Sequence, residues 1–188
     1  QKAIDSGRIE KRLDITVSEA LVLGLLKQGV KKYIAVFGHG STEIAEVLRI
    51  YQKAGLVRVY NVRNEIEASH AATALRWITG EKAAVVASIG PGPLQAIAAS
   101  LVPLSNGIGV WYLLGDETTE DEGPNFQQIP HSRQMQFTSL TGDMNQSYNL
   151  HTPLALGIAL RRGLNVVDHA HRAGPFYLLM PMNIQPVL

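Results

Sequence analysis

The sequence lacks several features that would point to particular classes of protein. None of its 188 residues is cysteine, which excludes disulfide bonds and thiolate chemistry and fits a cytoplasmic location. Its longest apolar runs, such as residues 108–114, are far shorter than a membrane span, so we expect no membrane insertion. The 17 Lys and Arg residues nearly balance the 16 Asp and Glu residues, and no basic tail indicates a nucleic-acid partner.

What the sequence does contain is an alternation of short apolar runs and segments with helical spacing. Hydrophobic residues make up 46% of the chain, which is typical of a globular domain with a buried core. We expect strands over residues 33–37, 57–62, 83–87, 107–115 and 176–180, and a short strand near 148–150. We expect helices over residues 16–29, 41–50, 65–79, 93–103 and 152–164. This alternation predicts an α/β fold.

The most informative stretch is residues 59–92. A β-branched run leads through a polar break into an Ala-rich helix that begins at Glu65 and closes at Thr79-Gly80. A second apolar run then ends in the turn Ser88-Ile89-Gly90-Pro91-Gly92. Ligands of open α/β sheets bind beyond the carboxyl ends of the strands. The stretch therefore predicts a site formed by Glu65 and the turn at residues 88–92.

These residues resemble the pyrimidine-binding (PYR) domain of thiamine diphosphate enzymes of the acetolactate synthase and decarboxylase group. In that family a strand ends in V-R-H-E, the helix that follows contains a His and closes at T-G, and a T-S-G-P-G turn comes one strand later. The chain has the corresponding residues at the family spacing: Val62-Arg63-Asn64-Glu65, His70, Thr79-Gly80 and Ser88-Ile89-Gly90-Pro91-Gly92. Several matches in register are more specific than any single one.

The resemblance implies a three-layer α/β/α fold with a mostly parallel, doubly wound sheet of about six strands. It implies a PYR domain over residues 14–188, preceded by an N-terminal arm over residues 1–13. Thiamine diphosphate is the implied cofactor, and Glu65 is the implied catalytic residue, which would hydrogen-bond the pyrimidine ring and share a proton with it. The glycine turns would let the backbone approach the cofactor closely. The implied cofactor-binding residues are Glu65, Gly38, His39, Gly40, Gly90, Pro91 and Gly92.

The resemblance also implies an enzyme that cleaves or forms C–C bonds, a lyase, transferase or hydrolase. Its small-molecule substrate would be a 2-keto acid, a cyclic 1,2-diketone or a ketose-like compound. Gly38-His39-Gly40 is similar to the branch of the family that contains trihydroxycyclohexanedione hydrolase. His39 there is either a substrate-facing proton carrier or a hydrogen-bonded loop histidine. Gln95 and Gln127 are weaker candidates for substrate contact. Gln95 takes the place of an Asn that is common in relatives, and Gln127 belongs to a segment that resembles the F-Q-E of the family.

Two further patterns have the residue types of metal sites. Gly115-Asp116 followed by Asn145 mimics the G-D-G…N spacing that holds Mg²⁺ and the diphosphate in the family, but Glu117 replaces the second glycine. Asp168-His169-Ala170-His171 falls in a connection between a helix and a strand. We therefore expect no metal site in this chain.

Because the G-D-G…N motif is missing, the resemblance implies a second subunit that carries it and holds Mg²⁺. We expect a split enzyme, an α₂β₂ heterotetramer that is active only with that partner; the alternative is that the chain is a shortened piece of a longer polypeptide. Two other interpretations stay open: a non-catalytic or regulatory paralogue with the same fold, and an α/β nucleotide-binding module. Against the nucleotide-binding module, the sequence lacks the third glycine of a dinucleotide fingerprint after Gly38 and Gly40. Retention of Glu65 favours the enzyme.

Overall fold

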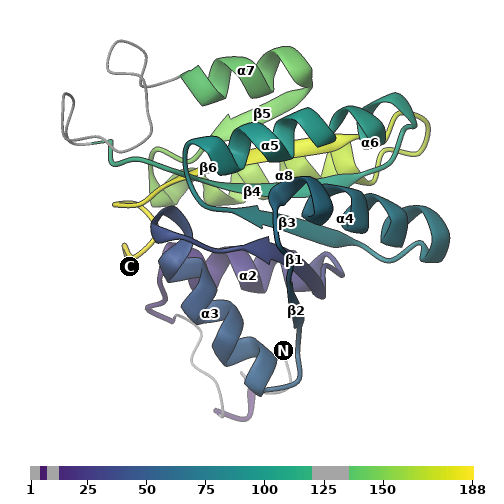
Figure 1. The fold of residues 1–188 in the computed structure, drawn as a ribbon. Coiled ribbons are helices and arrows are strands. Elements are labelled where there is room, and N and C mark those ends of the chain that lie inside the picture. Colours follow the sequence, from purple (N-terminus) through teal and green to yellow (C-terminus); the bar gives the residue numbers. More distant parts are fainter. Residues whose placement is uncertain (1–4, 8–12, 120–135) are drawn as a thin grey trace.

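A single six-stranded sheet forms the centre of the molecule (Figure 1). The computed structural model describes residues 5–7, 13–119 and 136–188. The strands are β1 (Lys32–Val36), β2 (Arg58–Asn61), β3 (Ala83–Ala87), β4 (Val110–Asp116), β5 (Gln146–Asn149) and β6 (Pro175–Pro181). Their order is β2-β1-β3-β4-β6-β5, and every neighbouring pair is parallel. The predicted doubly wound α/β sheet is confirmed.

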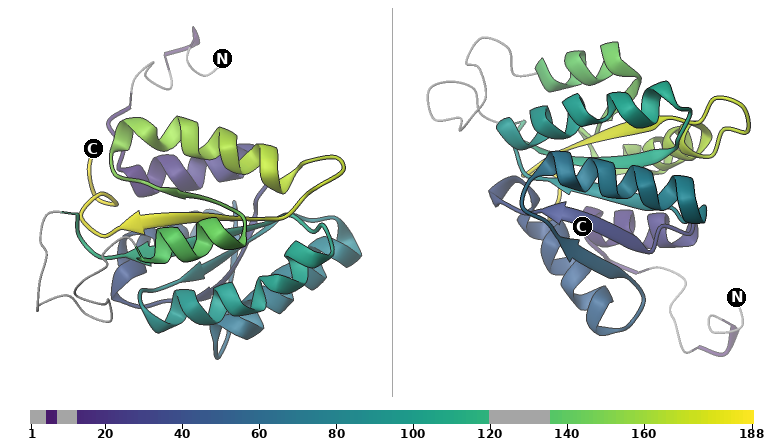
Figure 2. Two further views of the ribbon diagram at one scale, coloured as in Figure 1. Left: turned by 90° about the horizontal axis from the view of Figure 1, so that it is seen from above. Right: turned by 45° about the vertical axis from the view of Figure 1, so that its right-hand side comes forward.

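Helices cover both faces of this sheet, as the view from above shows (Figure 2). One face carries α2 (Val17–Lys27), α3 (Thr42–Lys53) and α8 (Leu156–Val167), and the other carries α4 (Glu65–Thr79), α5 (Pro91–Ala99), α6 (Leu101–Ser105) and α7 (Gln136–Met144). Two short 3₁₀ helices, η1 (His39–Ser41) and η2 (Pro153–Ala155), complete the described elements. The predicted three-layer arrangement is therefore confirmed. None of the described helices has the length and apolar character needed to cross a membrane.

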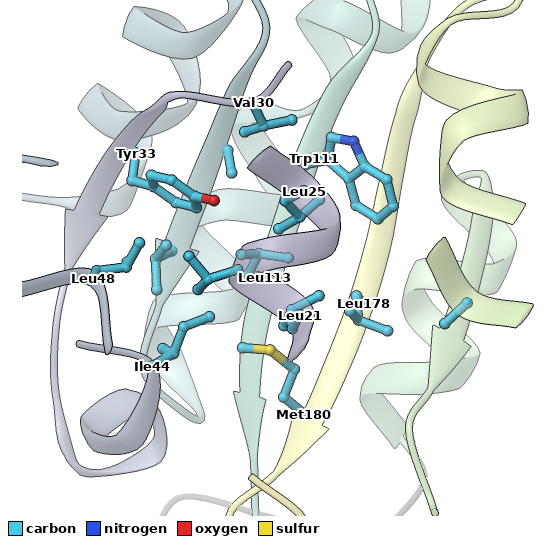
Figure 3. Packing of buried hydrophobic residues seen from close by; sticks show 14 of the residues in the cluster. Leu21, Leu25, Val30, Tyr33, Ile44, Leu48, Trp111, Leu113, Leu178 and Met180 are labelled. Atoms are coloured by element: carbon cyan, nitrogen blue, oxygen red, sulfur yellow. The ribbon is translucent and has the colours of Figure 1, made fainter. Parts of the chain in front are cut away.

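Two hydrophobic cores fill the spaces between the layers, because successive residues of a strand point to opposite faces. Trp111 and Leu113 of β4 join the core under α2, α3 and α8, whereas Tyr112 and Leu114 join the core under α4 and α5. Figure 3 shows the first core, with Leu25 of α2 beside the sheet residues. The central strands β3, β4 and β6 are buried along their whole length, as parallel strands between two helical layers should be.

Local sequence signals set the ends of several helices. At the start of α2, the Thr16 side chain accepts a hydrogen bond from the Glu19 N–H, and the Glu19 carboxylate accepts one from the Thr16 N–H. Helix α4 spans the predicted residues 65–79 and ends at Gly80, whose φ of 74° lies in the left-handed region. These two helices were predicted correctly because their boundary residues carry the signal themselves.

The single helix predicted over residues 93–103 is wrong. Helix α5 begins at Pro91 and ends at Ala99, and α6 follows after a break at Ser100. The hydroxyl of Ser100 lies 2.6 Å from the Ile97 carbonyl oxygen and 2.6 Å from the Tyr177 hydroxyl of β6. Pro103 has no N–H, so it cannot continue the helical hydrogen bonding across this break.

Candidate active site

The candidate site lies where the parallel strands end. Strand β1 is flanked by β2 on one side and by β3 on the other, so the chain leaves these strands in opposite directions. Such a switch point is where open α/β sheets bind ligands. The segments that follow β1, β2 and β3 contain Gly38-His39-Gly40, Glu65 and Gly90-Pro91-Gly92, so the topology brings the three predicted groups to one edge of the sheet.

Glu65 occupies the first position of α4. The preceding residue, Asn64, caps the helix by accepting a hydrogen bond from the Glu67 N–H at 2.9 Å. Glu65 is only 7% exposed, and its carboxylate has no hydrogen-bond donor or cation in bonding range within the part of the chain that the structure describes. The Glu65 oxygens are not among the fully buried, unpartnered atoms, so this mostly buried carboxylate can still be reached by a ligand. By contrast, the exposed Glu67 carboxylate accepts a hydrogen bond from the Arg63 N–H and supports the helix start.

The Gly90-Pro91-Gly92 turn packs directly against this carboxylate. Gly90 caps α5 with a φ of 66°, a left-handed conformation that favours glycine. A Cβ atom added to Gly92 would lie 2.7 Å from Glu65 Oε1, which is closer than real Cβ contacts come. Glycine at position 92 therefore makes room for the carboxylate, and the predicted acid and the predicted turn form one site.

The Gly38-His39-Gly40 loop packs against the segment that precedes this turn. A Cβ atom on Gly38 would lie 2.4 Å from Ser88 Oγ, and the Gly40 N–H donates to that same oxygen at 3.3 Å. A Cβ atom on Gly115, near the end of β4, would lie 2.3 Å from the Gly40 carbonyl oxygen. Small residues thus let the ends of β1, β3 and β4 approach closely, and this fixes the position of His39.

His39 pairs with an acidic residue after β4. Its Nε2 atom lies 3.6 Å from Glu117 Oε1, and its own side chain is 42% exposed whereas that of Glu117 is 7% exposed. Next to this pair, burial raises the pKa of Asp116 to about 6, and the Glu117 charge adds to the effect. The hydrogen bond from the Glu117 N–H to Asp116 Oδ1, 2.9 Å long, partly opposes that rise. The pair offers an exposed imidazole, oriented by a buried carboxylate, next to the glycine loop.

The two metal-like patterns are engaged in other contacts. Asn145 donates to the Pro175 carbonyl oxygen at 2.7 Å, and it is Asn149 whose amide lies 3.5 Å from Asp116 Oδ2. Asp168 forms ion pairs with Arg76, at 3.2 Å, and with Lys82. Among the described residues, no group of three or more His, Asp or Glu side chains is placed to hold a metal ion.

The two glutamine candidates do not join the central group. Gln95 is exposed on α5, three positions after Gly92, and no described contact links it to Glu65. Gln127 lies outside the described residues. Substrate contact by either residue stays a prediction.

Three residues that lie at this site had no separate role predicted from the sequence. Ser88 had a signal, because it directly follows the buried strand β3 and begins the predicted turn. Glu117 appeared only as a departure from a metal motif, although its buried carboxylate contacts His39. Gln185 donates to the Gly40 and Met180 carbonyl oxygens, both at 2.9 Å, and it lies 145 residues from Gly40. No local pattern could have predicted that contact.

The fold and this arrangement define an α/β domain that presents a buried carboxylate and two glycine turns to a ligand. Residues 15–137 match the family described as thiamine pyrophosphate enzyme, N-terminal TPP binding domain, and the chain belongs to that family. The family implies thiamine diphosphate as the cofactor. The unpartnered Glu65 carboxylate and the close approach at Gly92 fit a ring with a hydrogen-bonding nitrogen.

Several curated relatives carry the name 3D-(3,5/4)-trihydroxycyclohexane-1,2-dione hydrolase. The protein of that name from Listeria monocytogenes is 30% identical over 183 aligned residues, which cover 88% of this chain and 28% of the relative. Those from Bacillus subtilis and Clostridium perfringens are 27% and 26% identical, and the alignments cover 93% and 91% of this chain. The chain spans less than a third of the length of these relatives.

Proposed function

We propose that this chain is the pyrimidine-binding domain of a thiamine-diphosphate-dependent enzyme and that Glu65 is its catalytic residue. The observation that carries the proposal is the Glu65 carboxylate, which is buried, lies against Gly92 and has no partner among the described residues. In this proposal the Glu65 carboxyl group forms a hydrogen bond to a ring nitrogen of the cofactor, as activation of the cofactor requires.

The remaining groups at the site have supporting roles in this proposal. Bound thiamine diphosphate supplies the carbon nucleophile and the electron sink for chemistry at a carbonyl carbon. The backbone at Gly38, Gly40 and the turn 90–92 contacts the cofactor and excludes water from its ring. His39, held by Glu117, faces the substrate and carries a proton to or from its oxygen atoms.

The proposed reaction is cleavage or formation of a C–C bond in the cytoplasm. The names of the relatives favour a cyclic 1,2-diketone, with a 2-keto acid or a ketose-like compound as the wider class. Whether the enzyme is a lyase, a transferase or a hydrolase depends on which molecule accepts the fragment that is released when the bond is cleaved. An exposed imidazole near the site suits a substrate that carries several oxygen atoms.

A complete enzyme needs a second site for the diphosphate and Mg²⁺. The sequence contains no G-D-G motif, and the described residues that mimic its spacing are engaged in other contacts. We propose that a second subunit supplies this motif and the metal, in an α₂β₂ heterotetramer that is active only when both chains are present. A diphosphate-binding domain on the same, longer polypeptide is the other arrangement that would serve.

Reconstitution with the copurifying protein tests the catalytic proposal. Glu65→Gln removes the proton-holding group without changing the size of the side chain, and we expect it to lower kcat/KM by about 100-fold or more. Glu67→Gln is the matched control, because Glu67 lies two positions further on the same helix and is exposed. Its activity should stay within about threefold of the unmodified protein, since it touches only the helix start.

The same measurements separate the other interpretations. A non-catalytic paralogue would leave the rate of the reconstituted enzyme unchanged by Glu65→Gln. A nucleotide-binding module would bind NAD as the isolated chain and show no dependence on thiamine diphosphate. Activity without any added protein would refute the need for a second subunit.

A further inference from the structure

A cavity lies at the opposite edge of the sheet from Glu65. It has a volume of about 430 Å³, within the range of small-molecule sites. It is formed where α7 leads into β5, along the last turns of α8, and by the loop that leads into β6. Because all strands are parallel, the starts of β5 and β6 lie far along the sheet from the strand ends that form the candidate active site. Its polar lining consists of Asn145, Gln146, Arg162, Asn165, His169 and Arg172.

The charge of this lining has one sign. It contains two guanidinium groups and an imidazole but no carboxylate. Neither Arg162 nor Arg172 forms an ion pair with any residue that the structure describes. The neighbouring Asp168 is already neutralised by Arg76 and Lys82. Two arginines without acidic partners at one cavity are typical of a site for a phosphate or another dianion.

Contacts within the fold hold several of these donors in place. The Arg162 guanidinium lies 5.5 Å from the centre of the Tyr148 ring, which restricts its side chain. His169 Nδ1 accepts hydrogen bonds from the backbone N–H groups of Arg172 and His171 at 3.0 and 3.2 Å. With Nδ1 accepting, the neutral ring carries its hydrogen on Nε2 and acts as a donor there. A ligand would therefore meet Arg162 and His169 already restrained, whereas the exposed Arg172 guanidinium would have to be ordered on binding.

The end of α8 beside this cavity would repel an anion if its last carbonyl groups were free. They are not free. The Leu164 carbonyl accepts a hydrogen bond from the Asp168 N–H, and the Val166 carbonyl accepts from the Gly174 and His169 N–H groups. Backbone donors that follow the helix thus offset part of the partial negative charge of this helix end. The two arginines set the local charge.

We propose that this cavity binds a small phosphorylated anion, at a site separate from the thiamine diphosphate site. Arg162 and Arg172 form paired hydrogen bonds with the phosphate oxygens, and His169 Nε2 donates to the same group. The volume exceeds that of a phosphate group, so an organic part of the ligand extends along Gln146 and Asn165. The site does not depend on the identity of the reaction at Glu65.

Titration of the full 188-residue chain with inorganic phosphate tests this proposal. Backbone amide signals are followed by NMR while chloride keeps the ionic strength constant. We expect saturable shifts at Gln146, Asn165 and Arg172, and none at Gly92. Arg172→Gln should raise the Kd for phosphate about tenfold or more, because one charge-assisted contact is lost. Arg162→Gln should do the same, and Arg172→Gln still tests the proposal if loss of the Tyr148 contact unfolds that variant.

Arg161→Gln is the matched control. Arg161 lies next to Arg162 on α8 and is exposed, but it does not line the cavity. Its Kd for phosphate should stay within about twofold of the unmodified chain, since it keeps every contact named above. The proposal is overturned if phosphate produces no more shift than chloride. It is also overturned if Arg161→Gln weakens binding as much as Arg172→Gln does.

Discussion

Adding one methyl group at Gly92 tests the proposed geometry of the active site most directly. In Gly92→Ala the new Cβ atom would lie 2.7 Å from Glu65 Oε1, so the carboxylate must retreat by about 0.7 Å to reach ordinary contact at 3.4 Å. The tip of a glutamate side chain is flexible enough to make that movement. We therefore expect the fold to persist while the acid leaves its productive position.

The structure suggests the size of both effects. Alanine is better than glycine in a helix by up to about 1 kcal/mol, and an off-rotamer Glu65 costs about 0.5–1.5 kcal/mol. These effects nearly cancel, so the Tm should change by less than about 4 °C. Catalytic groups must lie within about 0.5 Å of their productive positions, and a displacement of 1 Å costs about 100-fold in rate. The smaller movement here should lower kcat/KM by about tenfold.

A double-mutant cycle distinguishes this explanation from a general loss of structure. If Gly92→Ala acts through the carboxylate, it should have little further effect in the Glu65→Gln background. Gly157→Ala is the control, because a Cβ atom there meets nothing within 4 Å. The assay is activity of the reconstituted enzyme, with circular dichroism to confirm folding. Additive losses in the cycle, or full activity of Gly92→Ala, would refute the reasoning.

Three further predictions concern stability. The pKa of Asp116 is raised from 3.8 to about 6, so its protonated carboxyl group stabilises the fold below pH 4, and that contribution is lost as the pH rises through 6. Asp116→Asn should therefore be more stable than the unmodified protein by roughly 1–3 kcal/mol at pH 8. Urea titrations should show this stability difference disappearing below pH 4. In Gly163→Ala the added Cβ atom would lie 1.9 Å from the Trp111 ring, so we expect a loss of about 3 kcal/mol or more, whereas Gly157→Ala on the same helix should be neutral or stabilising by denaturant unfolding. Asn64→Ala removes the cap of α4 and should cost about 1 kcal/mol in thermal unfolding; an unchanged Tm would show that the cap contributes nothing.

Local signals explain which parts of the fold the sequence could predict. Helix α4 was predicted from residue 65 to residue 79 because a capping residue and a left-handed glycine mark its ends. Strand β3 was predicted at residues 83–87 because it is a short apolar run between polar segments. Pro103 was a local signal for the break at Ser100, but the contact of the Ser100 hydroxyl with Tyr177, 77 residues away, could not be predicted. Sequence spacing carries no record of such contacts.

The candidate site divides in the same way. Glu65 and the glycine turns were found because they belong to one motif in register, and the structure places Gly92 against Glu65. The role of Glu117 was missed because it depends on the meeting of two strand ends, after β1 and after β4. The cofactor contacts of Pro91 and Gly40, like the substrate role of His39, stay predictions that the reconstituted enzyme can test.

The hydrogen bond from Gln185 to the Gly40 carbonyl has a consequence for how the domain matures. It joins residues that are 145 positions apart in the sequence and supports the loop that positions His39. During synthesis, that loop must wait for the last strand and the residues after it to emerge before it is held in place. Parallel sheets with such distant contacts fold slowly. A shortened chain that ends before residue 185 should keep much of its secondary structure while leaving the first loop unsupported.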